Sequence, residues 1–506
     1  MELLTDRYTE EIAGVISCYD RIVIQGTLPG FSYAQGMTNF LKLNHIRIFD
    51  YTKFTEPLRD IIRKNAREIA KENGLEIEHI MKNDFRKDSC INEIVKKRGN
   101  HPGLVHIFSA MEPCPSYKPW HNKETGKTYL TYTSGKCIHY YFYFIDEMLG
   151  LCYVRVPTWC PFRVQIYFNG HTWLALELQN QGISYKQIEN AFVYIENFVE
   201  AQHISDSLTV ETIHKKCDEF AERFCPVFKQ FNLRYTWTIM QVEYATDIIF
   251  TRQRDLRYIY DNLTRTAIHT VKPDNIATFL GKKLHGKYQG EMGNNFNTRI
   301  EGTRIKHRMG PVTIKMYDKF GIILRIETTV CDVSFFKLYR KVEHRDRSLS
   351  MKLAPMRKSI YSLSALKEVL LAANRRYMQF ISAIDDVSVG VSKLNPISNT
   401  VVVNNRSYKG FNFFDEDDQK LFETIACGEF NISGFQNKHL RYKIKGKTSA
   451  QISRILKRLH THGLIKKIGR TYKYYLTKFG CHVLSMGLKL KELVIIPELT
   501  GTLCYA

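Results

Sequence analysis

The sequence predicts an α+β multidomain fold, in which a mixed α/β body with a helical insertion precedes a smaller C-terminal domain. Three patterns predict it. Strand-like and helical segments alternate over residues 1–180, helical spacing follows over 181–275, and short helices with two strands close the chain. The 506 residues correspond to about three domains, at roughly 150 residues each. The hydrophobic fraction of 44% is that of a globular protein.

The first 180 residues read as one α+β domain. Arg21 to Thr27 forms an apolar, β-branched run that Pro29 and Gly30 end, which indicates a buried strand. Residues 52–73 place their apolar side chains at helical spacing, so we expect a helix there. Further strands are predicted where aromatic and β-branched residues gather, at 104–108, 137–145 and 151–156.

The middle of the chain changes character twice. Residues 181–275 are predicted to be a helical region, because Ile188, Val193 and Ile195 fit one helical face. Residues 276–390 are predicted to be an α+β segment that starts with basic loops and ends with a helix over 363–385. Within it, strands over 313–317 and 322–328 are joined by a short turn typical of a β-hairpin. A linker with a short strand or two is expected at 391–412.

The charge of the chain points to a polyanionic partner. Its 73 Lys and Arg residues against 51 Asp and Glu give a net charge of +22, and such a surplus replaces the counterions of phosphates. Residues 281–310 hold seven Lys and Arg residues and two Glu residues, so we expect Arg304, Lys306 and Arg308 to contact nucleic acid.

Cysteine usage and hydropathy exclude other classes of protein. The 12 cysteines are scattered without a C-x-x-C pair, so neither a zinc set nor a disulfide framework is expected. The most apolar stretch, 139–156, is interrupted by Asp146, Glu147 and Arg155, and the first twenty residues do not read as a signal peptide. We therefore expect a cytoplasmic protein that does not cross a membrane and, in a bacterium, associates with the nucleoid.

The C-terminal region, 413–506, has the element order of a winged helix-turn-helix. Helices are predicted over 415–427, 432–442 and 450–462, followed by strands over 464–468 and 472–476. Residues 431–490 contain fourteen Lys and Arg residues and no acidic residue, which favours contact with phosphates. The expected nucleic-acid contacts lie on the third helix and the wing: Gln451, Arg454, Lys457, Arg458, Lys466, Lys467, Arg470, Tyr472 and Lys473.

Two resemblances refine these expectations. The stretch ISRILKRLHTHGLIKKIGRTYKYYLTKFG resembles winged-helix regulators, notably the MarR-like group. The segment GTRIKHRMGPVTIKMYDKFGIILRIETT resembles the Tyr-Asp/Asn-Lys and Arg-x-Glu pattern of rolling-circle replication initiators. That resemblance implies a nucleophilic Tyr317, with Lys319 and Arg325 steadying the phosphate and the leaving oxygen. It implies that Glu327, with Asp318 as a further candidate, holds Mg²⁺ or Mn²⁺.

A second line of reasoning begins at Asp20. An aspartate before an apolar strand is a pattern found in RNase-H-like nuclease cores, where other carboxylates complete a two-metal site. The downstream candidates are Glu177, Glu243, Asp247, Asp318 and Glu327. A purely structural interpretation, in which Asp20 is a polar residue at a strand edge, stands beside it.

The preferred hypothesis is a nucleic-acid-binding protein of a mobile element or replicon, whose candidate chemistry is metal-dependent DNA nicking of the transposase-like or replication-initiator-like kind. One alternative is a winged-helix transcriptional regulator whose body senses a ligand or forms a homodimer. Another is a non-enzymatic RNA-binding component of a ribonucleoprotein, and neither alternative needs a cofactor. DNA is thus the expected partner, with RNA as the alternative.

Overall fold

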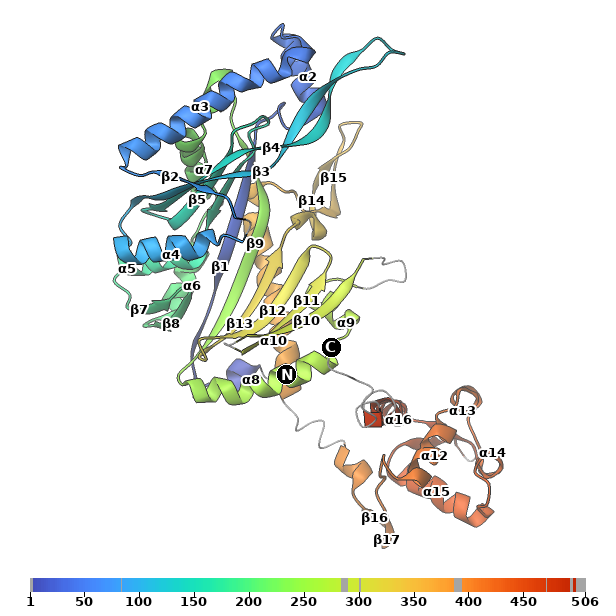
Figure 1. Cartoon of the computed structure of the whole chain (residues 1–506). Helices are drawn as coiled ribbons and strands as arrows, with labels where there is room; N and C mark the ends of the chain where they lie inside the picture. Colours follow the sequence, from blue (N-terminus) through green and yellow to red (C-terminus); the bar gives the residue numbers. More distant parts are fainter. Residues whose placement is uncertain are drawn as a thin grey trace. The chain divides into compact units, whose positions relative to one another are not determined.

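The chain divides into two compact units, residues 1–385 and 386–506. The computed structural model describes residues 3–82, 84–283, 290–299, 302–385, 394–469, 471–491 and 495–496. Unit 1 is built on one large sheet with helices on its faces, and unit 2 is mostly helical (Figure 1). The predicted mixed α/β class is therefore confirmed.

Eleven strands form the sheet of unit 1, in the order β10-β11-β12-β13-β9-β1-β6-β5-β4-β3-β2. Neighbouring strands of this sheet are antiparallel, except for the parallel pair β2 and β3. The strands are β1 (Ile12–Thr27), β2 (Ile77–Ile80), β3 (Gly103–His121), β4 (Thr128–Asp146), β5 (Gly150–Pro157), β6 (Val164–Phe168), β9 (Thr236–Phe250), β10 (Met292–Arg299), β11 (Gly302–Met309), β12 (Val312–Lys319) and β13 (Ile323–Val330).

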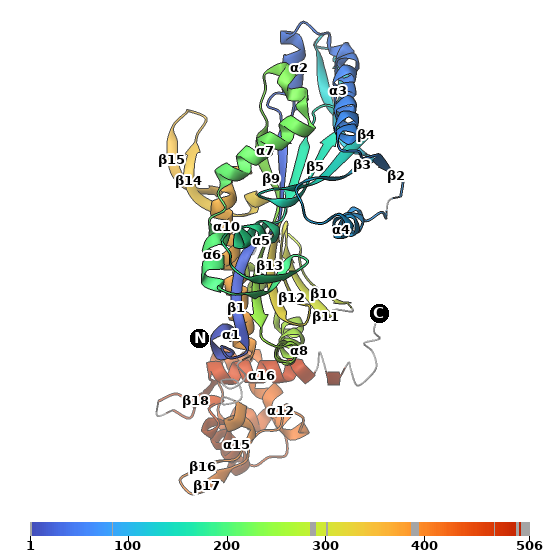
Figure 2. The same ribbon diagram turned by 90° about the vertical axis from the view of Figure 1, so that its left-hand side faces the viewer.

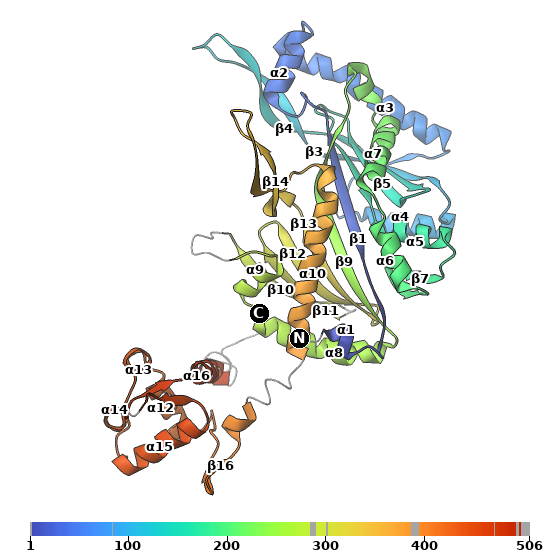
Figure 3. The same ribbon diagram turned by 180° about the vertical axis from the view of Figure 1, so that it is seen from behind.

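Helices cover the sheet of unit 1 unevenly. Beside β3 to β5, α4 packs on one face while α3 and α7 pack on the other (Figure 2). Across β9 and β13, the long helix α10 covers one face, together with α8 (Figure 3). The main helices are α2 (Ala34–Leu43), α3 (Tyr51–Glu72), α4 (Lys87–Arg98), α5 (Gly170–Asn180), α6 (Phe198–Asp206), α7 (Val210–Phe224), α8 (Gln253–Thr270), α9 (Pro273–Phe279) and α10 (Leu363–Asp385).

Alternation along β12 shows how the two faces of the sheet differ. Val312, Ile314 and Met316 are fully buried in the core beneath α10, whereas Lys315 and Tyr317, which alternate with them, are only half-buried. Successive side chains of a strand point to opposite faces, so the polar residues of β12 gather on the face away from α10. Each buried aliphatic side chain stabilises the fold by roughly 1.5–3 kcal/mol.

The predicted helical region is wrong in two places. Residues 185–195 form a hairpin of β7 (Tyr185–Ile188) and β8 (Ala191–Ile195), and β9 is a strand at the centre of the large sheet. The apolar residues of both segments also fit helical spacing, but β-branched and aromatic side chains dominate them and pairing with distant strands decides their structure. Helices α6, α7, α8 and α9 do fall within the predicted region.

Unit 2 has its own hydrophobic core, made of residues such as Phe422, Leu440 and Leu456. A short hairpin, β16 (Val401–Val403) and β17 (Arg406–Tyr408), occupies the predicted linker. The elements that follow are α12 (Glu416–Ile425), α13 (Gly428–Ser433), α14 (Asn437–Lys443), α15 (Ser449–Thr461), β18 (Ile465–Lys467), β19 (Tyr474–Leu476) and α16 (Lys478–Leu490). Two short helices thus replace the predicted second helix, while the third helix and the two strands lie where they were expected.

None of the described helices combines the length and the apolar character that crossing a lipid bilayer requires. Outside the large sheet of unit 1, β14 (Lys337–Glu343) and β15 (Leu349–Pro355) pair with each other.

Candidate active site

The hairpin of β12 and β13 places the central motif on one face of the sheet. Lys315 lies directly opposite Glu327, and Tyr317 lies opposite Arg325. Because directly paired residues share a face, all four side chains project to the side away from α10. Lys319, two residues beyond Tyr317, lies on the same face. The turn needs Gly321, whose φ is +70°. The predicted hairpin is confirmed.

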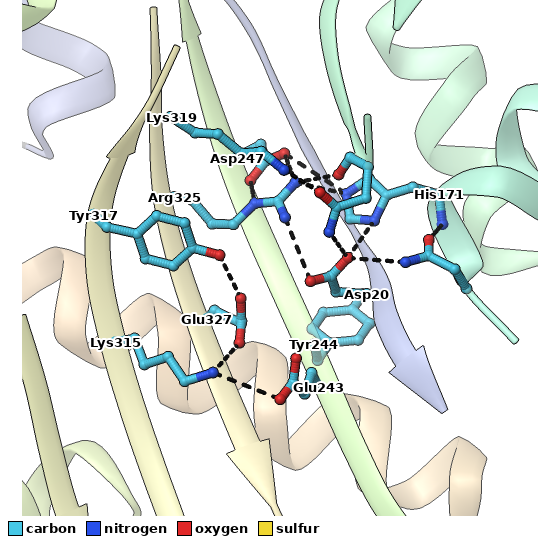
Figure 4. A network of polar contacts seen from close by, with 12 residues as sticks. Asp20, His171, Glu243, Tyr244, Asp247, Lys315, Tyr317, Lys319, Arg325 and Glu327 are labelled. Atoms are coloured by element: carbon cyan, nitrogen blue, oxygen red, sulfur yellow. Dashed lines mark hydrogen bonds and ion pairs between the residues drawn. The ribbon is translucent and has the colours of Figure 1, made fainter. Parts of the chain in front are cut away.

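Three carboxylates converge on this face from three adjacent strands. Asp20 of β1, Glu243 of β9 and Glu327 of β13 bring one oxygen each to within 4.8 Å of one another (Figure 4). A register irregularity of β1 against β9 falls at Asp20, between Tyr19 and Arg21. Oxygen donors of this kind suit Mg²⁺ or Mn²⁺, so the residues present fit a divalent metal.

The charge balance of these carboxylates also fits a cation. Burial and the nearby charge of Glu327 raise the pKa of Glu243. Lys315 contributes the nearest compensating charge: its Nζ lies 2.5 Å from Glu327 Oε1 and 3.6 Å from Glu243 Oε1. Burial is the largest cause of this raised pKa, and repulsion from Glu327 adds to it even with Lys315 present. A bound divalent cation would relieve that repulsion.

Tyr317 is hydrogen-bonded to the carboxylate cluster. Its Oη donates to Glu327 Oε2 at 2.6 Å (Figure 4). Burial and the charge of Glu327 raise the pKa of Tyr317 well above its ordinary value. At neutral pH the side chain is therefore a phenol that already has a carboxylate placed to accept its proton.

Arg325 is fully buried, and its guanidinium contacts other groups of the protein. Nε and Nη2 each lie 2.6 Å from an oxygen of Asp247, and Nη2 also donates to the carbonyl oxygen of Asn190 at 2.7 Å. Nη1 lies 3.5 Å from Asp20 Oδ2. Nη1 has no hydrogen-bond partner among the described residues. Arg325 therefore holds Asp20 and Asp247 in place, and its implied contact with a phosphate stays a prediction.

Arg325 fixes the ionisation of both aspartates. Burial alone would raise the pKa of Asp20, but the charge of Arg325 and a hydrogen bond from His171 hold it well below its usual range. The same two partners outweigh burial at Asp247, whose pKa is lowered to about 2. Both carboxyl groups are thus charged at neutral pH, as ligands or partners of a cation must be.

Three residues that sequence reasoning missed surround Asp20. Asn169 donates to Asp20 Oδ1 at 3.2 Å, and Asn190 donates to the same oxygen at 2.5 Å. His171 lies between Asp20 and Asp247, with its ring nitrogens 3.3 and 3.6 Å from their oxygens. Asn169 gives the one local signal: its side chain caps the N-terminus of α5. Glu243 and Asp247 were among the downstream carboxylates considered with Asp20, and Glu177 is not part of this group.

Lys319 lies at the edge of this network, next to the turn of the β7–β8 hairpin. Its Nζ donates to Asn190 Oδ1. Burial and the charge of Arg325 lower the pKa of Lys319 to about 8. Asp318 is corrected as a metal candidate. It follows Tyr317 in the strand and so points to the opposite face, where its Oδ1 accepts a hydrogen bond from the Gly321 N–H at 2.9 Å.

The predicted basic residues of β11 lie on the same face as the carboxylate cluster. Lys306 is paired with Lys315 of β12, and Arg304 and Arg308 alternate with it. The Nε atom of Arg304 is buried without a hydrogen-bond partner among the described residues, although its charge is felt by Lys315. A buried guanidinium nitrogen without a partner is costly, and an anionic oxygen would satisfy it.

The predicted contact residues of unit 2 fall into two groups. Arg454 and Lys457 of α15 are exposed, as are Lys466, Lys467 and Tyr472 of the strand pair β18–β19 and its turn. Gln451 is exposed too, but its Oε1 accepts the Thr448 N–H as part of the helix cap. Lys473 is half-buried, with its Nζ 5.7 Å from the ring centre of Tyr475, and Arg470 lies outside the described residues.

Arg458 is corrected from a nucleic-acid contact to a structural residue. Its guanidinium nitrogens lie 2.8 and 3.0 Å from the two carboxylate oxygens of Asp418, and they donate to the carbonyls of Lys409 and Gly410. It also stacks on Phe411, 3.8 Å from the ring centre. This residue therefore ties α15 to α12 and to the chain before it.

Comparison with known proteins adds little to this geometry. No family model matches the chain, and no curated protein matches it. Among solved structures, a rolling-circle replication initiator protein from Geobacillus stearothermophilus is similar over 63% of this chain and 75% of its own, at 7% identity and a TM-score of 0.18. A TM-score this low carries no argument about fold or function.

Proposed function

We propose that the protein is a metal-dependent DNA-nicking enzyme of a replicon or mobile element, with Tyr317 as its nucleophile. The observation that carries this proposal is the arrangement of Asp20, Glu243 and Glu327. Their oxygens lie within 4.8 Å of one another, and one of these carboxylates accepts the hydrogen bond of Tyr317. A nucleophile beside a cation-binding set of carboxylates is what cleavage of a phosphodiester requires.

Each residue has a definite part in the proposed reaction. Asp20, Glu243 and Glu327 hold a divalent metal, which when bound supplies positive charge to the phosphate undergoing attack. Tyr317 Oη forms a bond to phosphorus, and its proton passes to Glu327. The bond from phosphorus to the leaving sugar oxygen breaks, and that oxygen takes up a proton. The product is a phosphotyrosine ester and a free hydroxyl at the nick.

Two cations complete the proposed site. The Nε atom of Arg304, buried without a partner in the described chain, would bind a non-bridging phosphate oxygen. Lys319 would protonate the leaving oxygen, since its pKa of about 8 makes it a far better proton donor near neutral pH than an ordinary lysine. Arg325 and Asp247 bind each other and act as positioning residues.

We propose further that unit 2 grips the DNA as a winged helix. Its acid-free stretch 431–490 and the exposed Arg454 and Lys457 on α15 support this role. A helix whose basic residues point to solvent fits the major groove, and the β18–β19 pair fits the neighbouring backbone.

Incubation of the protein with labelled supercoiled plasmid and Mg²⁺ or Mn²⁺ tests the proposal. We expect open circular product and a covalent protein–DNA adduct that survives denaturation. Tyr317→Phe should abolish the adduct, and Asp20→Asn or Glu327→Gln should abolish both adduct and nicking. The matched controls are Tyr339→Phe and Glu200→Gln, at exposed positions of unit 1, which should leave both products unchanged.

The variants separate the alternatives. Nicking that survives Tyr317→Phe but not Asp20→Asn would replace the tyrosine mechanism by attack of water at the same carboxylates. The absence of nicking together with tight binding to a short palindrome would favour the transcriptional regulator. Copurifying RNA would favour the ribonucleoprotein component.

A further inference from the structure

A groove of about 690 Å³ lies within unit 2, between the β16–β17 hairpin and helix α15, which are both labelled in Figure 1. One wall is β17 with the residue that follows it, and the other is one face of α15. The basic residues of its lining are Arg406, Lys409, Arg454, Lys457 and Arg458. Among the described residues that line the groove, none is acidic. Positive charge therefore faces the groove from both walls.

Most of this charge has no partner inside the protein. Arg458 is neutralised by Asp418, whose carboxylate oxygens lie 2.8 and 3.0 Å from its guanidinium nitrogens. The other four basic side chains, two on the hairpin and two on α15, are exposed and make no hydrogen bond or ion pair within the described part of the chain. A cleft lined by charges of one sign focuses their field on whatever enters it. An anion in the groove would relieve the repulsion among these four cations.

The hairpin is tied to α15, so the groove is part of the fold of unit 2. Directly after β17, Arg458 donates to the carbonyl oxygens of Lys409 at 2.9 Å and Gly410 at 2.5 Å. At the far end of the hairpin, Asn404 and Asn405 both have positive φ values, as a two-residue type I′ turn requires. The hairpin thus carries its two basic side chains on a defined backbone beside α15.

The shape and the chemistry of the groove favour a nucleic-acid backbone. Its volume exceeds that of one phosphate ion, and its unpaired cations stand along two walls instead of around one point. Ser407 and Ser453 in the lining add hydroxyl groups, which together with Arg and Lys side chains are the usual contacts of backbone phosphates. Because α15 is the helix proposed to enter the major groove of DNA, the backbone at the edge of that groove comes next to it.

We propose that the groove between β17 and α15 binds the phosphate backbone of one DNA strand, so that the β16–β17 hairpin is a further arm of the nucleic-acid interface of unit 2. Arg406 and Lys409 contact this backbone from one side, and Arg454 and Lys457 contact it from the other. These contacts come in addition to those proposed for the β18–β19 pair. The inference rests on the proposed binding of DNA by unit 2, and it needs neither the metal nor Tyr317.

Fluorescence anisotropy with the full-length protein, a short labelled DNA duplex and EDTA tests the hairpin arm. Arg406→Ala combined with Lys409→Ala should lower the affinity about tenfold or more at about 100 mM salt, because two phosphate contacts are lost. The slope of log affinity against log salt should become shallower by about two. Arg458 contacts only the backbone of Lys409, so the fold should be kept, and an unchanged circular dichroism melt checks this.

The matched control removes the same two charges from exposed positions of unit 1, as Lys229→Ala combined with Arg252→Ala. There each cation already has an acidic partner: Lys229 lies 3.2 Å from Glu222, and Arg252 lies 3.0 Å from Asp255. This variant should bind the duplex as the parent protein does. Equal affinities for the hairpin variant and the control variant would overturn the proposal.

Acetylation footprinting locates the contact without any substitution. Lysines of the full-length protein are modified with a small acetylating reagent, with and without the duplex, and are quantified by mass spectrometry. We expect the duplex to protect Lys409 and Lys457 and to leave Lys229 reactive. Unchanged reactivity of Lys409 in the complex would overturn the proposal. Equal protection of Lys409 by millimolar inorganic phosphate would overturn it too, because the groove would then be a site for a free anion.

The outcomes also separate this inference from the proposed function. Weaker binding in Arg454→Ala combined with Lys457→Ala, but not in the hairpin variant, would keep the winged helix and remove the hairpin arm. Absence of nicking in the plasmid experiment, together with impaired binding of the hairpin variant and protection of Lys409, would remove the nicking function and keep the groove.

Discussion

The charge state of Lys319 should be visible in the pH dependence of the proposed reaction. Its pKa is lowered to about 8, so the ammonium form predominates below that pH and is lost as the pH rises through it. We expect the rate of adduct formation to fall above pH 8. In Lys319→Arg the guanidinium stays charged but is a poor proton donor, so we expect a lower rate that no longer declines above pH 8. The measurement is the single-turnover rate against pH, and the same decline in both proteins would exclude Lys319 as the proton donor.

Arg325 makes a different prediction, because it acts inside the protein. Replacing it by Met leaves Asp20 and Asp247 as buried charges without their main partner. Loss of one partner of a buried ion pair costs roughly 3–5 kcal/mol. We expect the thermal midpoint of unit 1 to fall by several degrees in Arg325→Met. Arg345→Met, at an exposed position, is the control, and equal midpoints for the two variants would contradict the assignment.

Individual residues also show how much of the candidate site could be predicted from the sequence. Asp20 and Glu327 could be proposed as ligands, because a carboxylate beside an apolar strand and an Arg-x-Glu pattern are visible along the chain. Asn190 could not, since it reaches Asp20 across 170 positions and only the folded sheet brings the two together. The ion pair of Arg325 with Asp247 could not be predicted either, because Asp247 comes from another strand.

At the scale of elements, helix α15 carries one structural arginine, Arg458, and two exposed basic residues, Arg454 and Lys457. Arg458→Ala breaks the contacts to Asp418 and should lower the thermal midpoint of unit 2. Arg454→Ala combined with Lys457→Ala should leave the midpoint unchanged, weaken duplex binding and flatten its dependence on salt by about two phosphate contacts. Fluorescence anisotropy from 50 to 200 mM salt measures this. Unchanged affinity in the double variant would remove the helix from the interface.

Elements with a clear local signal were predictable, even where their partners are distant, as for the predicted strand 21–27 in β1. The β12–β13 hairpin was visible because its turn chemistry lies within the sequence itself. β9 was misread as helix, because its apolar residues satisfy both periodicities and its two neighbours, β1 and β13, lie far away in the chain. The helix cap of α15 at Thr448 is again local, and the helix predicted over 450–462 lies there.

The whole molecule is two units with separate cores, and this division predicts two unfolding transitions. Residues 386–506 bury their own apolar cluster, so we expect that segment, expressed alone, to fold and to bind duplex DNA. Residues 1–385 alone should keep the nicking activity with weaker binding. Circular dichroism melts and the plasmid assay on each segment measure this. Loss of folding in either segment would mean that the units depend on each other.

The division into two units also determines which part of the chain gives tryptophan fluorescence. All four tryptophans, Trp120, Trp159, Trp173 and Trp237, belong to residues 1–385, and unit 2 has none. The indole emission of the intact chain therefore comes from unit 1 alone, because unit 2 has no tryptophan. A single tryptophan introduced at Tyr472, which is 77% exposed, would give that unit its own optical signal without disturbing a core.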